Sequence, residues 1–156
     1  MTIGTLEVNL VDARGLPNTD FFKHKIDPYA LIQCSSQQLK SKIAKRQGSN
    51  PKWNEKFKFR VEYPGVDKHP KLVFKIMDHD TFTADDYLGE ATIYLKEVLE
   101  QGIENGIAEL HAQKYSVVGK HQKYCGDVQV ALTFIPEVET DVYGQGFGGW
   151  KESQGQ

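Results

Sequence analysis

The sequence contains 156 residues, a length typical of one compact domain with its own hydrophobic core. Its 19 basic and 21 acidic residues give a formal net charge of −2, which excludes a global attraction to nucleic acid and leaves any anionic partner to a local basic patch. It has no apolar stretch near the roughly 18 residues of a membrane span, and its N-terminus has no signal-peptide pattern. We therefore expect a cytoplasmic protein that meets any membrane reversibly, at its surface.

Alternating apolar and polar residues predict an all-β protein with eight strands. In the first strand, Leu6, Val8 and Leu10 alternate with polar neighbours. One short helix is expected at residues 96–101, ending at Gly102, between the sixth and seventh strands. Eight antiparallel strands are enough for a two-sheet β-sandwich. The predicted strands cover residues 6–10, 29–34, 39–43, 57–61, 72–77, 88–95, 107–117 and 127–135.

The composition changes after Pro136. Residues 1–136 are expected to form the domain. Residues 137–156 are expected to form a flexible tail, because a segment rich in Gly and Gln buries too little apolar surface to offset the entropy of ordering it. The aromatic residues of the tail, Tyr143, Phe147 and Trp150, leave open an alternative in which a short motif docks on the sandwich or on a partner.

The most informative segment is residues 77–90, which places Asp78, Asp80, Asp85 and Asp86 in one short loop between two predicted strands. Two like charges about 4 Å apart repel by roughly 4 kcal/mol at an effective dielectric constant of about 20. Such a loop needs a cation to relieve this repulsion, and hard carboxylate oxygens favour calcium or magnesium over zinc or copper.

A second acidic loop, flanked by Asp20 and Asp27, precedes the second predicted strand. Because the loops of a β-sandwich cluster at its two ends, this fold can bring the two acidic loops together. An EF-hand does not fit the longer acidic segment. Thr83 stands where the sixth loop position needs glycine, and Glu90 falls one place beyond the twelfth position.

Three motifs together resemble the C2 domain, the calcium- and phospholipid-binding module. They are Asp27-Pro28-Tyr29, NPKWNEKFKF at residues 50–59 and DHDTFTADDYLGE at residues 78–90, in the family's order. The resemblance covers residues 4–136 and implies an eight-stranded antiparallel β-sandwich of C2 type. More narrowly, the chain is similar to the small single-domain plant proteins described as elicitor-responsive or sixteen-kilodalton phloem proteins. Because the chain begins directly on its first strand, its strand order is similar to the circularly permuted, phospholipase-like (type II) topology.

The resemblance also implies a set of Ca2+ ligands. Asp85 is expected to be a solvated neighbour of the site, and strand alternation turns His79 away from the ligands. The first acidic loop is one residue longer than the family's commonest pattern and carries three basic or titratable residues at 23–25, which would weaken calcium binding and favour anionic lipid. The implied ligands are Asp20, Asp27, Asp78, Asp80 and Asp86.

Two groups of residues are expected to contact lipid. Phe21, Phe22 and Phe82 stand where the family has its membrane-inserting tips; alternatively, at least one of them packs inward and braces its loop. The second group is a basic face, for which a solvated surface without a ligand is the alternative. Lys40 and Lys42 are expected to share one face of a strand, extended by Lys58 and Arg60 of a neighbouring strand. The basic face consists of Lys40, Lys42, Lys45 and Arg46.

The function implied by the resemblance is calcium-dependent binding to anionic phospholipid membranes. A monomer would move from the cytoplasm to the plasma membrane when calcium rises, in signalling tied to plant defence. The alternative is a phloem-type carrier of RNA and other proteins whose basic face binds RNA, although the sequence has no RNA-binding motif with aromatic stacking platforms. The sequence contains no nucleophile-elbow, zinc-protease or nucleotide-binding motif, so the chain is not expected to be an enzyme.

Overall fold

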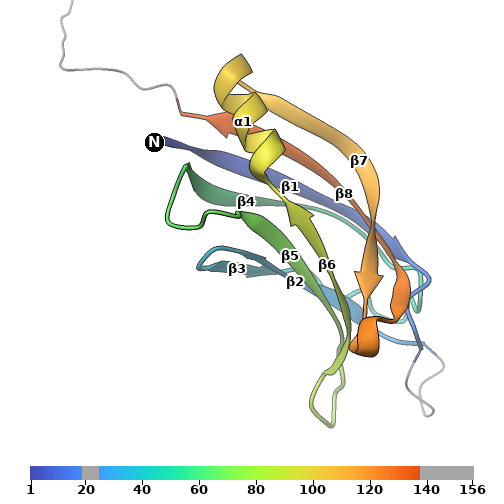
Figure 1. Ribbon diagram of the computed structural model, residues 1–156. Coiled ribbons are helices and arrows are strands. Elements are labelled where there is room, and N and C mark those ends of the chain that lie inside the picture. The colour runs from blue at the N-terminus through green and yellow to red at the C-terminus, as the bar shows by residue number, and fades with distance from the viewer. Residues whose placement is uncertain (19–24, 138–156) are drawn as a thin grey trace, which may run out of the picture.

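The computed structural model describes residues 1–18 and 25–137. Within them the chain forms eight strands, one α-helix and one 3-10 turn (Figure 1). The helix α1 spans Lys96–Asn105 and the turn η1 spans Lys120–Gln122. The strands are β1 (Thr2–Arg14), β2 (Pro28–Cys34), β3 (Gln37–Lys40), β4 (Lys52–Tyr63), β5 (Lys71–Asp78), β6 (Asp86–Tyr94), β7 (Ala108–Val118) and β8 (Tyr124–Pro136).

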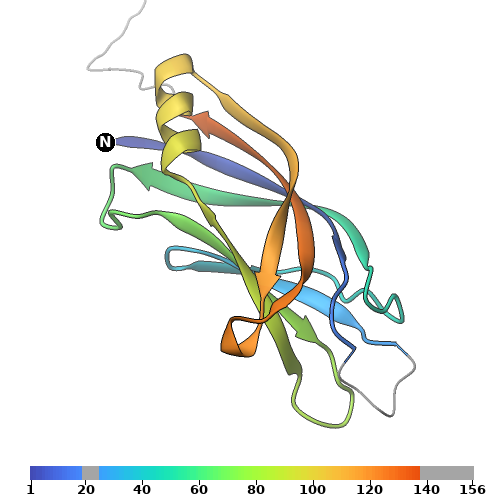
Figure 2. The same cartoon turned by 45° about the vertical axis from the view of Figure 1, so that its right-hand side comes forward.

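The strands are antiparallel and follow the order β3-β2-β5-β6-β7-β8-β1-β4. The ladder bends over between β6 and β7, where Glu90 and Val118 form its one register pair. The strands on either side of this bend form the two layers of a sandwich (Figure 2). The edge strands β3 and β4 are joined by the Gln37 amide, which donates to the Arg60 carbonyl (2.7 Å) and accepts from its N–H (3.1 Å). This confirms the predicted all-β antiparallel sandwich, whereas the type II topology stays a prediction.

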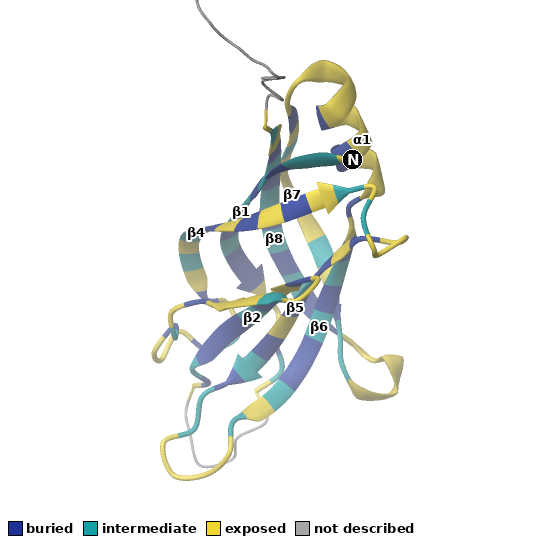
Figure 3. Ribbon diagram, turned by 90° about the vertical axis from the view of Figure 1, so that its left-hand side faces the viewer, coloured by how far each residue is buried: buried dark blue, intermediate teal, exposed yellow. Residues whose placement is uncertain are grey.

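The core lies between the two layers and is made by alternate residues of each strand. Along the strands, buried and exposed positions alternate (Figure 3). The predicted inward-facing residues Leu6, Val8 and Leu10 are all fully buried. Phe59, Phe74 and Phe134 are among the largest fully buried side chains, and burying each contributes about 1.5–3 kcal/mol. A rigid sandwich therefore carries the loops at its two ends.

The prediction that the helix stops at Gly102 is wrong. The helix continues to Asn105 and ends at Gly106, which has a left-handed backbone with φ 87°. Gly102 is buried, and a Cβ atom added there would lie 2.6 Å from the ring of Phe134. Glycine is needed at this position because the helix packs closely against β8, not because the helix ends there. No helix among the described residues is long and apolar enough to cross a membrane.

The third strand ends earlier than predicted, at Lys40 rather than residue 43. The buried Ser41 interrupts the ladder, because its hydroxyl accepts the N–H of Ala30 (2.8 Å) that a strand carbonyl would otherwise take. Lys42 therefore lies outside the strand, and the expected alternation of Lys40 and Lys42 on one strand face is wrong.

Replacing Gly102 with alanine tests the close contact between helix and sheet. Alanine has the higher helix propensity by about 1 kcal/mol, yet we expect Gly102→Ala to destabilise the protein by about 1–3 kcal/mol through overpacking against Phe134. Urea unfolding measures the difference. Gln101→Ala, at the exposed neighbouring position, should stay within about 0.5 kcal/mol of the unaltered chain. A Gly102→Ala variant as stable as the unaltered chain would contradict this packing.

Candidate functional site

Hydrogen bonds between main chains join the loops at one end of the sandwich. The N–H of Leu16 donates to the Ser49 carbonyl (3.1 Å), and the N–H of Gly48 donates to the Ile26 carbonyl (3.1 Å). These bonds attach the described parts of the β1–β2 connection to the β3–β4 loop. The β5–β6 loop extends from the same end, at the bottom of Figure 1.

Asp27 links all of these segments. Its N–H donates to Oδ1 of Asp78 (2.9 Å), and its carbonyl accepts from the N–H of His79 (3.0 Å). Its own Oδ1 accepts from the N–H of Arg46 in the β3–β4 loop (2.6 Å). Arg46 has φ 56°, a left-handed conformation that costs a residue with a side chain about 1–2 kcal/mol. The hydrogen bond to Asp27 helps to hold the β3–β4 loop in that conformation.

Among the described carboxylates of this end, Asp78 is the most buried, with no exposed surface. It stands at the end of β5, in register with Pro28 on one side and Asp86 on the other. An ionised carboxylate can be buried at acceptable cost only when hydrogen bonds or a cation compensate for its lost hydration. We call the end of the sandwich that carries Asp27, Asp78, Asp80 and Asp86 the acidic end. Asp78 lies between β2 and β6 and is the innermost of these four carboxylates.

Asp80 shapes the tip of the β5–β6 loop. Its Oδ1 accepts the N–H groups of Phe82 (3.0 Å) and Thr83 (3.4 Å), which turns the chain tightly. The side chain of Phe82 is 94% exposed at this tip. The alternative that Phe82 packs inward is therefore excluded in this structure.

The prediction that Asp85 is a solvated neighbour is wrong. Asp85 is half-buried, and its carboxylate accepts hydrogen bonds from the hydroxyl of Tyr29 and from the N–H of Asp80 (3.0 Å). Nδ1 of His79 lies 3.4 Å from Oδ1 of Asp85, which is not one of the predicted ligands, so the expectation that His79 faces away from the ligands stays a prediction. The N–H of Asp80 and the hydroxyl of Tyr29 lower the pKa of Asp85. Burial, together with Asp85, raises the pKa of Tyr29 to about 12.

The remaining predicted ligands are placed differently. Asp86 is the first residue of β6 and is exposed. Asp20 lies outside the described residues, as do Phe21 and Phe22. Within residues 1–18 and 25–137, no three His, Cys, Asp or Glu side chains are gathered closely enough to hold a metal ion. The donors present are hard carboxylate oxygens, the chemistry that calcium prefers.

The basic face is divided between a strand and a loop. Nζ of Lys40 lies 4.4 Å from the centroid of the Tyr29 ring, a cation–π contact. Lys42, Lys45 and Arg46 are exposed in the β3–β4 loop. The expected extension by Lys58 and Arg60 does not come from a strand paired with β3, because β4 pairs with β1, and Arg60 forms an ion pair with Glu137 (3.2 Å).

The comparisons with known proteins agree with this architecture. The family model described as "C2 domain" matches residues 4–110. The chain belongs to the C2 domain family. It is 45% identical over 155 residues to 16 kDa phloem protein 1 of Arabidopsis thaliana, with 99% of each chain covered. This confirms the narrower resemblance to the small plant proteins.

Two solved structures extend the likeness. The C2 domain-containing protein from an elicitor-responsive gene is 38% identical with a TM-score of 0.69, covering 90% of this chain and 96% of that one. The calcium-bound structure of two successive C2 domains of Extended-Synaptotagmin 2 is 26% identical with a TM-score of 0.64. It covers 84% of this chain and 45% of that one. The C2 fold of this chain is therefore shared with a protein whose structure contains calcium.

The contacts of Asp85 predict an effect of pH on stability. Because its pKa in the folded chain lies below the usual 3.8, the stabilisation it provides is present above that value and is lost as the pH falls through the folded pKa. Asp85→Asn should therefore be less stable than the unaltered chain at pH 7, and the difference should narrow below about pH 4. Urea unfolding of both proteins at pH 7 and pH 3, without calcium, measures it. If the two proteins differed in free energy of unfolding by the same amount at pH 7 and pH 3, the stabilising role of the Asp85 carboxylate would be contradicted.

Proposed function

We propose that this protein binds anionic phospholipid membranes in a calcium-dependent manner and moves from the cytoplasm to the plasma membrane when calcium rises. One observation carries the proposal: the loop end that holds the carboxylates of Asp27, Asp78 and Asp80 also presents the exposed ring of Phe82. Membership of the C2 family and the likeness to a calcium-bound relative support it.

Electrostatics gives the proposal its mechanism. The proposed ligands Asp20, Asp27, Asp78, Asp80 and Asp86 carry five negative charges, which repel an anionic membrane. Bound calcium would neutralise these carboxylates and offer coordination positions to lipid phosphates. The hydrogen bonds of Asp27 and Asp78 hold their carboxylates in place before any ligand arrives, which lowers the entropy cost of binding.

The side chains around the acidic end would add direct lipid contacts. Lys45 and Arg46 are exposed on the loop that Asp27 holds, and each basic residue near an anionic surface contributes about 1 kcal/mol. The ring of Phe82 would enter the membrane interface, where burial of apolar surface contributes about 25 cal/mol per Å². Phe21 and Phe22 are proposed as further inserting residues from the first loop.

The plant relatives bear on the biological setting. Their names, a phloem protein and an elicitor-responsive gene product, lead us to propose a role in defence signalling. The carrier alternative, in which the basic face binds RNA, stays a prediction. The two functions differ in their response to calcium and salt: RNA binding would need no calcium and would weaken steeply with added salt through counterion release.

Calcium should stabilise the fold, because it would bind only the assembled loops and remove carboxylate repulsion. At a calcium concentration about 100 times Kd, we expect the melting temperature to rise by about 5–10 °C relative to chelator. Asp80→Asn should abolish most of this rise. Asparagine removes the charge but keeps an oxygen that can accept the N–H of Phe82, so the loop turn is preserved.

Asp67→Asn is the matched control for this experiment. Oδ1 of Asp67 accepts the N–H of His69 (3.0 Å), the same local turn as at Asp80, but in the β4–β5 loop at the other end of the sandwich. This variant should keep the full calcium response. An unchanged melting temperature of the unaltered chain at millimolar calcium would count against the proposed site.

Phe82→Ala tests the proposed insertion into lipid. Because the side chain is 94% exposed, its loss should change the free energy of unfolding by less than about 0.5 kcal/mol. The affinity for anionic vesicles in calcium should fall severalfold. Tyr94→Ala is the control, since Tyr94 is also an exposed aromatic residue (72%) but lies beside α1. Equal vesicle affinities of the two variants would exclude a special role for Phe82.

A further inference from the structure

We propose that Tyr29 and Asp85 form a brace that positions the β5–β6 loop for calcium, with Tyr29 as a positioning residue and Asp85 outside the ligand set. The effect on calcium affinity rests on the proposed function. The effect on the loop itself rests on contacts within the chain and can be tested without calcium.

The brace begins in the sheet. Tyr29 is the second residue of β2 and only 5% of it is exposed, so the residues packed around it restrain its ring. Its hydroxyl donates a hydrogen bond to Oδ2 of Asp85, which lies in the β5–β6 loop. Residues 79–85 extend beyond the last register pair of β5 and β6, between Asp78 and Asp86. The Tyr29 hydroxyl therefore attaches the protruding β5–β6 loop to β2, the strand that flanks β5 on the side away from β6.

The brace continues from Asp85 to the tip of the loop. Oδ1 of Asp85 accepts the N–H of Asp80 (3.0 Å), and Asp80 in turn accepts the N–H groups of Phe82 and Thr83. One carboxylate thus connects the buried ring of Tyr29 to the main chain of a proposed ligand. Movement of Asp85 would displace both the carboxylate of Asp80 and the exposed ring of Phe82.

The chemistry of Asp85 separates it from the proposed ligands. Both of its oxygens accept hydrogen bonds from within the chain, one from a phenol and one from a main-chain amide. These donors stabilise its negative charge without a metal ion. The family motif places the ligand at the neighbouring Asp86, whereas the contacts of Asp85 suit it to hold the loop in the conformation that presents Asp80.

The surroundings of Tyr29 allow a selective test. Lys40 lies over the face of its ring at 4.4 Å from the centroid, and the ring of His79 lies edge-on at 6.5 Å between centroids. Phenylalanine keeps the ring in both contacts and removes the hydroxyl alone. Tyr29→Phe therefore cuts the brace while leaving the core and the basic face in place.

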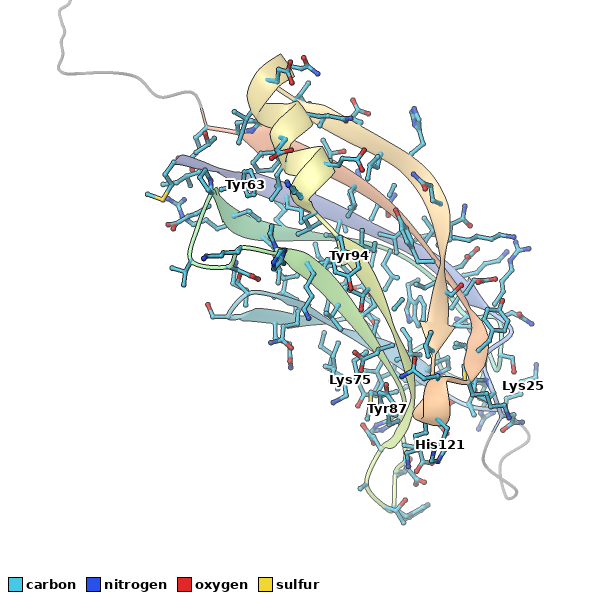
Figure 4. The ribbon with its side chains drawn as sticks, viewed as in Figure 1. Lys25, Tyr63, Lys75, Tyr87, Tyr94 and His121 are labelled. Carbon is cyan, nitrogen blue, oxygen red and sulfur yellow. The ribbon has the colours of Figure 1, made fainter. Side chains whose placement is uncertain are left out.

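The control is Tyr63→Phe. The hydroxyl of Tyr63 also donates to a carboxylate, Oε2 of Glu100 (2.8 Å), but Tyr63 lies beside α1, at the opposite end from Tyr87 and His121 (Figure 4). This variant loses the same chemical contact far from the loop. Asp85→Ala, alone and combined with Tyr29→Phe, completes a double-mutant cycle.

Two measurements on the full chain test the brace. In chelator, amide hydrogen exchange followed by NMR reports the N–H groups of Asp80 and Phe82, whose acceptors are the carboxylates of Asp85 and Asp80. Calorimetric titration with calcium chloride reports affinity. We expect Tyr29→Phe to speed exchange of the Asp80 amide about tenfold and to weaken calcium binding by a similar factor, the size of effect expected for a hydrogen bond to a charged group. Tyr63→Phe should change neither quantity.

The outcomes distinguish the brace from the proposed function. Adding Tyr29→Phe to Asp85→Ala should have little further effect, because both changes break one connection. Exchange of the Asp80 amide at the unaltered rate in Tyr29→Phe would overturn the brace, even if calcium binds normally. Absence of calcium binding by the unaltered chain would overturn the proposed function, and the exchange comparison would still decide whether the brace exists.

Discussion

The hydrogen bond from the main chain of Asp27 to the buried carboxylate of Asp78 is the contact on which the acidic end depends. It joins the start of β2 to the end of β5 at a distance of 2.9 Å, where the two strands are already in register. Because Asp78 is fully buried, its charge needs such donors. The same bond fixes Asp27, whose carboxylate then holds the N–H of Arg46. Three connections of the sandwich are thereby fixed relative to one another.

This arrangement separates a rigid core from the loops that it carries. The core residues of both layers, such as Leu10 and Phe74, are fully buried and set the spacing of the strand ends. The strand ends in turn set where the carboxylates lie. Beyond the last register pair the ladder no longer restrains the chain, so the position of Asp80 depends on side-chain contacts. The contacts between Tyr29, Asp85 and Asp80 supply that restraint within the described part of the loop.

The sequence predicted the features that depend on periodicity and on charge density. Alternating residues such as Leu6, Val8 and Leu10 revealed the strands, because one face of each strand must be buried. The crowding of aspartates revealed the acidic end, and the exposure of Phe82 at its loop tip was also foreseen. These properties are local, so a short stretch of sequence contains them.

Features that depend on contacts between distant segments were missed. The burial of Gly102 depends on Phe134, which lies in another element, so sequence reasoning mistook this glycine for a helix stop. The bond between Tyr29 and Asp85 joins residues 56 positions apart, and side-chain directions inside a loop do not follow strand alternation. The one available signal was the pair of adjacent aspartates at 85 and 86, of which the family motif assigned Asp86 as a ligand and left Asp85 as a solvated neighbour.

The proposed function is that calcium converts an acidic loop end into a membrane-binding surface. Its most direct test is sedimentation of the purified full chain with phospholipid vesicles, neutral or anionic, in calcium or in chelator. We predict that the protein sediments with anionic vesicles in calcium and stays in the supernatant in chelator. Equal sedimentation with anionic vesicles in calcium and in chelator, or no sedimentation in either, would contradict the claim.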